Sequence, residues 1–290
     1  AGDRRENKNL EIVLLEKGEV ISYGSCAIPY YIGVIIPDWK PLVHHNPEEF
    51  KKERNIDVRT HAEAVKLITE TKTVFYLHEG QKKEIKYDKL LIATGGAPFD
   101  PFNVRGKYEN LFLCRNVEDA IAIRKSVEGL SGKKAVVLGS GYIGLELACA
   151  FKNRGLEVEI LERDNSILRG FLPVIASEAL AYLDKKGIHI HLSESVTGFA
   201  GEGKVEKVIT EKGEYSADIV LMAIGAKPAN EFLIDSGLQF GSFGELKIDK
   251  SMLTNIADIW AAGDCAGTYN AFTGEYTYFP LAQTANRQGK

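Results

Sequence analysis

The chain has 290 residues, of which 44% are hydrophobic and 26% charged, and its formal net charge is −4. These values predict a globular protein large enough for two domains, give no electrostatic case for a nucleic-acid partner, and leave no apolar run near the roughly 20 residues that cross a bilayer. The four cysteines form no CxxC pair, which argues against a zinc site or a secreted disulfide scaffold and favours a reducing cytoplasm.

The first third of the chain predicts several short strands and one helix. Residues 10–15 form an apolar run that ends at Glu16, which is typical of a buried parallel strand. Asn46 followed by a proline and two acids predicts a capped helix over 47–52. We further expect strands at 56–59, 64–68, 73–77 and 83–87, and a buried strand over 90–96 that ends in a glycine turn.

A lone cysteine, Cys26, follows a small polar turn within residues 22–33. Pro29 lies just after it and predicts the first turn of a helix, where a missing N–H costs nothing. A sulfur near a helix N-terminus is favoured as a thiolate, which is able to act as a nucleophile, a redox centre or a charge-transfer partner of a flavin. Taken alone, the residue is equally well explained as a buried core cysteine.

The second half of the chain alternates helices and strands. The expected order is a helix at 117–130, a strand before residue 139, a helix to about 154, a strand at 158–162, a helix at 176–186, and strands at 188–192 and 219–224 around a hairpin region at 196–215. A β-like stretch at 246–248, a buried strand over the run 259–264 and a helix that starts near Pro280 follow. This alternation predicts parallel sheets with crossover helices and therefore an α/β fold.

A glycine-rich loop carries the strongest local motif. Gly139, Gly141 and Gly144 form GxGxxG between a strand and a helix, and Glu162 ends the next strand 23 residues after Gly139. This spacing predicts a dinucleotide site with the pyrophosphate at the helix N-terminus. Glu162 is suited to the adenosine ribose of NADH, whereas Arg163 beside it is suited to the 2′-phosphate of NADPH. A glycine turn without a ligand is the alternative.

Two further acids end apolar strands. Glu16 is suited to the ribose of a second adenine dinucleotide, although a glycine loop for that ligand would lie about 20 residues upstream. Asp264 closes the run 259–264 and is suited to a ribityl hydroxyl, with a helix N-cap as its structural alternative.

Taken in chain order, these elements resemble the pyridine nucleotide-disulfide oxidoreductase superfamily. The resemblance rests on the strand-end Glu16, the run 92–95, the GxGxxGxE block that ends at Glu146, and the block from Thr254 to Asp264. Two-cysteine members carry CxxxxC or CxxC, whereas this chain has Cys26 alone there. It therefore resembles the single-cysteine branch, which contains coenzyme A-disulfide reductases, NADH oxidases and NADH peroxidases. Residues 22–33 and 279–286 are most similar to the coenzyme A-disulfide reductases.

The resemblance implies two Rossmann-like, three-layer dinucleotide-binding domains. Residues 1–115 and 241–290 would form the two parts of an FAD domain, and residues 116–240 an NAD(P)H domain. In such proteins a first strand and its glycine loop would precede Leu10, which residues 1–9 do not supply, and a C-terminal dimerisation domain would follow Lys290. We therefore expect a piece of a longer, homodimeric protein. A nucleotide-binding fragment that lacks flavin is the non-enzymatic alternative.

The resemblance also implies roles for individual residues, with Cys26 against the flavin. Those that would contact FAD are Glu16, Lys17, Val58, Arg115, Asp264 and Ala282. Those that would contact NAD(P)H are Gly139, Gly141, Tyr142, Ile143, Gly144, Glu162 and Gly225. Ser22 and Ser25 fall where relatives contact coenzyme A, although serines are also ordinary turn formers.

The implied activity is the reduction of coenzyme A disulfide, or of a related persulfide or polysulfide, by NAD(P)H through FAD and Cys26. Cys26 would form a mixed disulfide with coenzyme A. The alternative is an NADH oxidase or NADH peroxidase in which Cys26 becomes a sulfenic acid. We expect Cys114 and Cys149 to be packing residues, and Cys265 to have no redox role.

Overall fold

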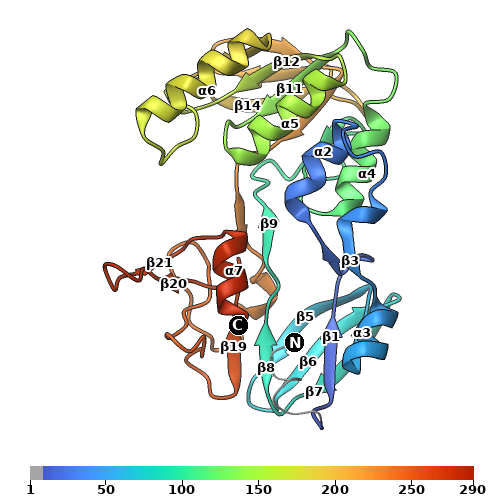
Figure 1. Ribbon diagram of the computed structural model, residues 1–290, viewed down its shortest axis with the longest axis vertical. Helices are drawn as coiled ribbons and strands as arrows, with labels where there is room; N and C mark the ends of the chain where they lie inside the picture. The colour runs from blue at the N-terminus through green and yellow to red at the C-terminus, as the bar shows by residue number, and fades with distance from the viewer. Residues whose placement is uncertain (1–8) are drawn as a thin grey trace. The chain divides into compact units, whose positions relative to one another are not determined.

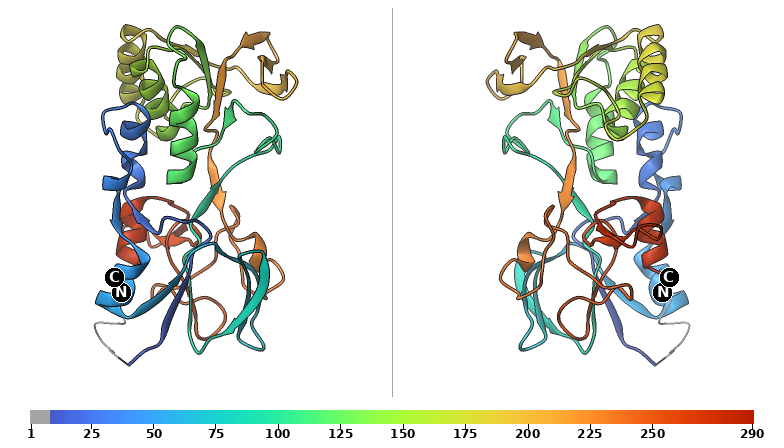
Figure 2. Two further views of the ribbon diagram at one scale, coloured as in Figure 1. Left: turned by 90° about the vertical axis from the view of Figure 1, so that its right-hand side faces the viewer. Right: turned by 90° about the vertical axis from the view of Figure 1, so that its left-hand side faces the viewer.

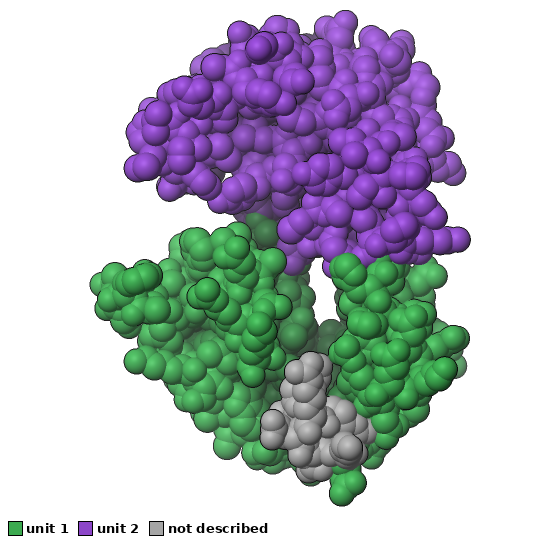
Figure 3. Space-filling model, in the orientation of Figure 1, with its two compact units in different colours: residues 1–22, 43–97, 226–290 green, residues 23–42, 98–225 purple. Residues whose placement is uncertain are grey.

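The computed structural model describes residues 9–290, and their contacts divide the chain into two compact units (Figure 3). Within the described residues, unit 1 comprises 9–22, 43–97 and 226–290, and unit 2 comprises 23–42 and 98–225. Unit 2 thus includes segments 23–42 and 98–115, which lie within the expected first FAD segment. The cofactor domains of the sequence analysis stay a prediction.

Unit 2 is built on a parallel five-stranded sheet. Its strand order is β10-β17-β11-β12-β13, and all neighbours are parallel. The strands are β10 (Leu111–Phe112), β11 (Lys134–Leu138), β12 (Glu157–Leu161), β13 (Ile188–His191) and β17 (Ile219–Met222). The crossover helices α5 (Tyr142–Asn153) and α6 (Pro173–Lys185) lie on the same face of the sheet (Figures 1 and 2). This arrangement confirms the expected α/β class.

The two faces of this sheet are covered by different layers. Ala135 and Val137 of β11 pack into a core with the helices, whereas Val136 and Leu138 pack into a second core on the other face. That second core is closed by an antiparallel sheet of β14 (Val196–Ala200), β15 (Lys207–Thr210) and β16 (Glu214–Ser216). Because both faces are covered, β11 is apolar at nearly every position, as expected of a buried parallel strand.

The segment that contains Cys26 also packs in unit 2. A 3₁₀ turn, η1 (Ser25–Ala27), leads into α2 (Ile28–Ile32), which has Pro29 in its first turn as predicted. Helix α2 packs against α5 and against α4 (Val117–Ser126), with Ile28 and Ile32 buried. A Cβ on Gly33 would lie 3.3 Å from the Cα atom of Ala150, which is tighter than ordinary contact, so glycine favours this close approach of α2 to α5.

Unit 1 contains two parallel strand pairs and an antiparallel sheet. β1 (Ile12–Leu15) pairs with β4 (Ile56–Arg59), and β8 (Leu90–Ile92) pairs with β19 (Ile259–Ala261). The antiparallel sheet is β5 (Ala62–Ile68), β6 (Thr73–His78) and β7 (Gln81–Lys86). Helix α3 (Pro47–Arg54) has the predicted cap, because Asn46 and Glu49 form a reciprocal capping box. Helix α7 (Ala282–Gln288) follows Pro280.

Several boundaries and short elements differ from the expectations. Helix α6 begins at Pro173 rather than Ala176, and α4 ends at Ser126 rather than Leu130. The expected stretch at 246–248 contributes bridges at Leu246 rather than a strand. The elements not predicted are β2 (Ser22–Tyr23), β3 (Val43–His45), β9 (Gly96–Pro98), β10 (Leu111–Phe112), β18 (Ala226–Pro228), β20 (Thr268–Tyr269), β21 (Tyr276–Thr277), η1 (Ser25–Ala27), η2 (Lys40–Leu42) and η3 (Glu231–Leu233). No helix between residues 9 and 290 combines the length and apolar character needed to cross a bilayer.

Candidate functional site

The glycine loop connects β11 to α5 at the carboxyl end of the sheet. Gly139 has φ +92°, which favours glycine, and a Cβ on it would lie 2.6 Å from the carbonyl oxygen of Ala223. A Cβ on Gly144 would lie well inside van der Waals contact of the Gly139 carbonyl oxygen. A Cβ on Gly141, by contrast, would meet no atom within 4 Å. The space at the first turn of α5 is therefore open, as the approach of a pyrophosphate requires.

Glu162, which follows β12, is hydrogen-bonded to the glycine loop. Its Oε2 accepts bonds from the Ser140 amide at 2.8 Å and from the Ser140 hydroxyl at 2.6 Å. Its Oε1 accepts a bond from the Asp164 amide at 2.9 Å. The structure thus brings Glu162 to the loop as the motif predicts, and fixes the orientation of its carboxylate.

An open pocket of about 640 Å³ lies beside this loop, lined by residues 163–171, Pro173 and Ser193. The Leu168 amide donates to the Ser140 carbonyl at 3.3 Å, which links the pocket wall to the loop. Arg163 and Arg169 approach Asp164 at 3.8 and 3.7 Å and are largely exposed. Tyr142 and Ile143, at the start of α5, are also exposed, and the Tyr142 ring packs edge-on against Phe171 at 5.5 Å between centroids.

Cys26 has the one exposed thiol among the four cysteines, all of which lie within the described residues. It sits in η1, just ahead of α2, and Ser25 precedes it in the same turn and is also exposed. The amide of Ala27 donates to the Gly24 carbonyl, and that of Gly24 to the Leu42 carbonyl, both at 2.9 Å. The thiol is thus presented at the surface of unit 2 on a hydrogen-bonded turn.

The other three cysteines are disfavoured as thiolates. Burial, with a smaller contribution from Asp119, raises the pKa of Cys114 from 9.0 to about 12. Burial also raises the pKa of Cys149 and that of Cys265. The expected packing roles of Cys114 and Cys149 agree with this environment, because a low pKa is what makes a thiol reactive.

Three of the residues expected at FAD lie at one edge of unit 1. Leu14 of β1 pairs with Val58 of β4, and Glu16 follows β1 directly. The Oε1 atom of Glu16 accepts a bond from the Gly18 amide at 2.7 Å. Lys17 is exposed and forms an ion pair with Glu63. A carboxylate at the end of a parallel strand accepts hydrogen bonds from the hydroxyls of a ribose, so this edge fits the adenosine part of a dinucleotide.

Asp264 and Ala282 lie elsewhere in unit 1, after β19. Gly263 has φ +84°, and its amide donates to Gln288 of α7 at 2.8 Å. The hydroxyl of Tyr278 donates to the Asp264 carbonyl at 2.9 Å. Ala282 is the first residue of α7 and is exposed. Hydrogen bonds therefore link the Gly263 turn to the C-terminal end of α7, and Tyr278 to the backbone of Asp264.

The remaining expected residues are divided between the units. Ser22 starts β2 in unit 1. Arg115 lies in unit 2, where its amide donates to Asp119 at 2.9 Å. Gly225, at φ +124°, ends unit 2 and its carbonyl accepts a bond from the Phe99 amide at 2.9 Å. The structure brings the glycine loop and Glu162 together in unit 2, and Glu16, Lys17 and Val58 together in unit 1.

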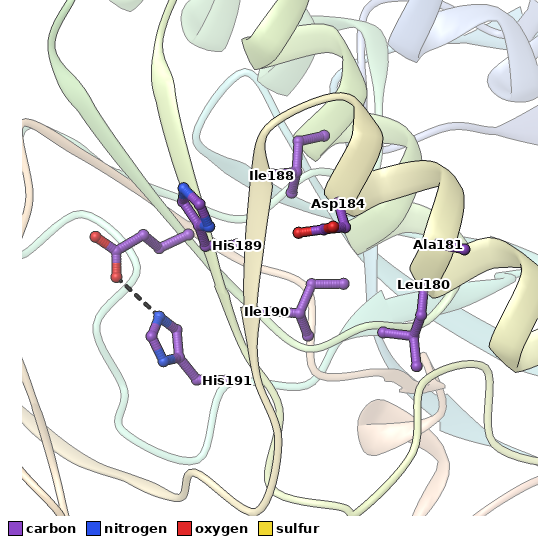
Figure 4. Close-up of a pocket in the computed structure, with 8 residues that line it drawn as sticks. Leu180, Ala181, Asp184, Ile188, His189, Ile190 and His191 are labelled. Atoms are coloured by element: carbon purple, nitrogen blue, oxygen red, sulfur yellow. Dashed lines mark hydrogen bonds and ion pairs between the residues drawn. The ribbon is translucent and has the colours of Figure 1, made fainter.

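A second open pocket, of about 570 Å³, lies at the sheet edge formed by β13 (Figure 4). Ile188 and Ile190 face α6, whereas His189 and His191 point to the other side of the strand. His191 is bonded through Nε2 to Glu159 at 3.0 Å. This bond ties β13 to β12. In the described part of the chain, no cluster of His, Cys, Asp and Glu has the arrangement of a metal site.

Sequence reasoning missed two residues that shape the site. Ser140 was the variable position of GxGxxG, and its hydroxyl gave no separate signal. Arg124 in α4 contacts the segment after Cys26 through Tyr31 and Ile36. No local pattern could have indicated a contact over this distance in the sequence.

A family model described as pyridine nucleotide-disulphide oxidoreductase matches residues 1–289. The chain belongs to this family. The family is FAD- and NAD(P)H-dependent, and the resemblance inferred from the sequence is confirmed.

Individual members of the family show the same relationship. The chain is 38% identical over 290 residues to a protein from Methanocaldococcus jannaschii named NADH oxidase. It is 32% identical over 287 residues to one from Pyrococcus horikoshii named NAD(P)H coenzyme A polysulfide/persulfide reductase. Each alignment covers 99% of this chain and 64% of the relative. The solved structure of an NAD-dependent persulfide reductase from A. fulgidus is similar with a TM-score of 0.92 and 33% identity, over 99% of this chain and 54% of that one.

Proposed function

We propose that the protein reduces coenzyme A disulfide, or a coenzyme A persulfide or polysulfide, with electrons from NAD(P)H, and that Cys26 is its redox-active group. The observation that carries the proposal is the exposure of Cys26 on its turn, while the environments of Cys114, Cys149 and Cys265 raise their pKa values. The oxidised partner of Cys26 would therefore come from the substrate. The name of the P. horikoshii relative supports this substrate class.

The chemistry at Cys26 is thiol–disulfide exchange. The Cys26 thiolate attacks one sulfur of coenzyme A disulfide, so that a Cys26–S–S–CoA bond forms and one coenzyme A thiolate leaves. Two electrons from NAD(P)H then cleave this mixed disulfide and return Cys26 and a second coenzyme A as thiolates, with release of NAD(P)⁺ and one proton. The net reaction converts one disulfide, one NAD(P)H and one proton into two coenzyme A thiols and NAD(P)⁺.

The residues of both units fit the two nucleotides. Gly139, Gly141 and Gly144 would hold the pyrophosphate of NAD(P)H, and Glu162 its adenosine ribose. In unit 1, Glu16 would bind the ribose of FAD and Asp264 its ribityl chain. FAD supplies the two-electron relay between a nicotinamide and sulfur. The roles proposed for Lys17, Val58, Arg115, Ala282, Ser22 and Ser25 follow from the family resemblance.

A second candidate function is that of an NADH oxidase, because the relative with 38% identity carries that name. Cys26 would then cycle through a sulfenic acid, with oxygen or peroxide as the electron acceptor. The exposure of Cys26 is compatible with both reactions. The homodimer and the cytoplasmic location stay predictions.

The test compares acceptors in the natural full-length protein and in its Cys26→Ser variant, with Cys149→Ser as the matched control. We expect NAD(P)H oxidation with coenzyme A disulfide to fall at least 100-fold in Cys26→Ser and to stay within twofold in Cys149→Ser. Mass spectrometry should find coenzyme A attached to Cys26 after incubation with the disulfide alone. Turnover with oxygen or peroxide but not with the disulfide would instead favour the oxidase.

A further inference from the structure

The segment that follows Cys26 ends in an unusual turn. Helix α2 is followed by Gly33 and then by Val34, whose φ is +62°. A β-branched residue pays a steric cost in this left-handed region, where glycine is the usual occupant. Gly33, the residue before Val34, has φ −76° and therefore does not relieve this cost. It lies instead where α2 approaches α5 closely.

Arg124 of α4 forms hydrogen bonds to the chain before and after Val34. One of its guanidinium nitrogens, Nη1, donates to the carbonyl oxygens of Tyr31 and Ile36, each at 3.0 Å. Its Cζ atom also lies 4.3 Å from the centre of the Tyr31 ring. The same side chain therefore binds the C-terminal end of α2, the residue after the Val34 turn, and a buried aromatic ring of the helix.

Arg124 supplies a positive charge at the C-terminal end of α2. Helix α2 has no basic residue in its own last turn, so its C-terminal carbonyl groups receive positive charge from α4. The backbone bonds of the turn, from Val34 to Tyr31 at 3.2 Å and from Ile35 to Tyr30 at 2.9 Å, surround the strained residue. Without Arg124, the strain at Val34 would favour unwinding of a helix that is only five residues long.

We propose that Arg124 is a positioning residue for Cys26. By fixing the far end of α2, it keeps that short helix wound, and the η1 turn that starts the same segment then presents the thiol in one orientation. The inference rests on the proposed role of Cys26 in disulfide reduction. It assigns Arg124 no contact with substrate or cofactor.

The first test is hydrogen exchange in the full-length protein with the variants Arg124→Met and Arg124→Lys, and with Lys125→Met as the matched exposed control. In Arg124→Met the amides of residues 33–36 should exchange at least tenfold faster, while those of β11 and β12 stay unchanged. Alkylation of Cys26 by iodoacetamide should become at least threefold faster, because the thiol is no longer held. Arg124→Lys should give intermediate values, since an ammonium group keeps the charge but lacks the planar guanidinium that lies over the Tyr31 ring. Unchanged exchange or alkylation in Arg124→Met would overturn the proposal.

The second test separates the cysteine step from the nucleotide step. In Arg124→Met, kcat/KM for coenzyme A disulfide should fall about tenfold, whereas NADH oxidation by ferricyanide, which bypasses Cys26, should stay within twofold. Adding Val34→Gly should recover most of the loss, because it removes the strain that the arginine offsets. Equal losses of both activities, or no recovery by Val34→Gly, would show a general structural role and refute positioning.

Failure of this proposal and failure of the proposed function give different results. If the unsubstituted protein does not reduce coenzyme A disulfide, the proposed function fails. The exchange and alkylation rates then still decide whether Arg124 holds the Cys26 segment.

Discussion

The carboxylate of Glu162 accepts hydrogen bonds from both the amide and the hydroxyl of Ser140, at 2.8 and 2.6 Å. The acid expected to recognise a ribose is thus fixed by the loop expected to bind the adjoining pyrophosphate. A ligand at either place would meet a carboxylate whose rotamer is already set, which lowers the entropic cost of binding.

This relationship leads to a prediction about dinucleotide preference. Glu162→Gln should retain the bonds from Ser140 through its amide oxygen, but it should lose the bond from the Asp164 amide and the negative charge that repels a 2′-phosphate. The ratio of kcat/KM for NADPH to that for NADH should rise about tenfold, or about 1.4 kcal/mol. Glu159→Gln, in the strand that leads to Glu162 but bonded to His191, is the control and should leave the ratio unchanged. An unchanged ratio in Glu162→Gln would contradict a ribose role for this residue.

The glycines of the loop should respond differently to the same substitution. Gly144→Ala places a Cβ against the Gly139 carbonyl and should reduce the free energy of unfolding by about 2–3 kcal/mol, measured by urea denaturation. Gly141→Ala meets no atom and should change that free energy by less than about 0.5 kcal/mol. Calorimetric titration with NADH should nevertheless show weaker binding in Gly141→Ala. Equal stability of the two variants would contradict the close contact between residue 144 and the Gly139 carbonyl oxygen.

Thiol labelling should distinguish the four cysteines. In the native protein, a chromogenic disulfide should react rapidly with Cys26 alone, more slowly with half-buried Cys149, and with Cys114 and Cys265 only after unfolding. Peptide mapping by mass spectrometry identifies each modified residue. Fast labelling of Cys114 or Cys265 in the folded protein would be inconsistent with their burial.

The raised pKa of Cys114 predicts a loss of stability at alkaline pH. Because its pKa is about 12 in the folded protein against an ordinary 9.0, the unfolded chain deprotonates first as pH rises. The stability contributed by this group is thus complete below pH 9 and is lost as pH rises toward 12. The difference in unfolding free energy between the native protein and Cys114→Ala should fall by about 1 kcal/mol between pH 8 and pH 10. A difference that does not change with pH would rule out this linkage.

The sequence predicted the structure best where an element is determined by residues that are close together in the chain. The capped start of α3 at Asn46, the alternation of β5 to β7 and the GxGxxG turn each depend on neighbouring residues, and each was correctly predicted. The start of α6 was missed because its N-cap, Leu172, forms no side-chain bond and gives no capping signal. The clustering of Glu16 with Val58 depends on the pairing of β1 with β4, which no local pattern shows. The resemblance implied only that both residues contact FAD.

The candidate site was predictable only in part, because some of its contacts depend on side-chain rotamers or join residues far apart in the sequence. A strand-end acid at Glu162 is visible as a spacing, but its bond to the Ser140 hydroxyl depends on a side-chain rotamer. The contact of Arg124 with Tyr31 joins residues 93 positions apart, and the pattern of residues 22–33 around Tyr31 does not indicate its partner. Such long-range contacts are set by helix packing, which residue periodicity does not resolve.

The division of unit 2 into residues 23–42 and 98–225 has a consequence for protein engineering. A fragment cut at 98 and 225 would contain the whole glycine loop and the parallel sheet, yet it would lack α2. The buried surfaces of α4 and α5 around Ile123 and Ala150 would then meet water. A stand-alone nucleotide-binding module from this chain should therefore include residues 23–42, joined by an artificial linker, and would carry Cys26 with it.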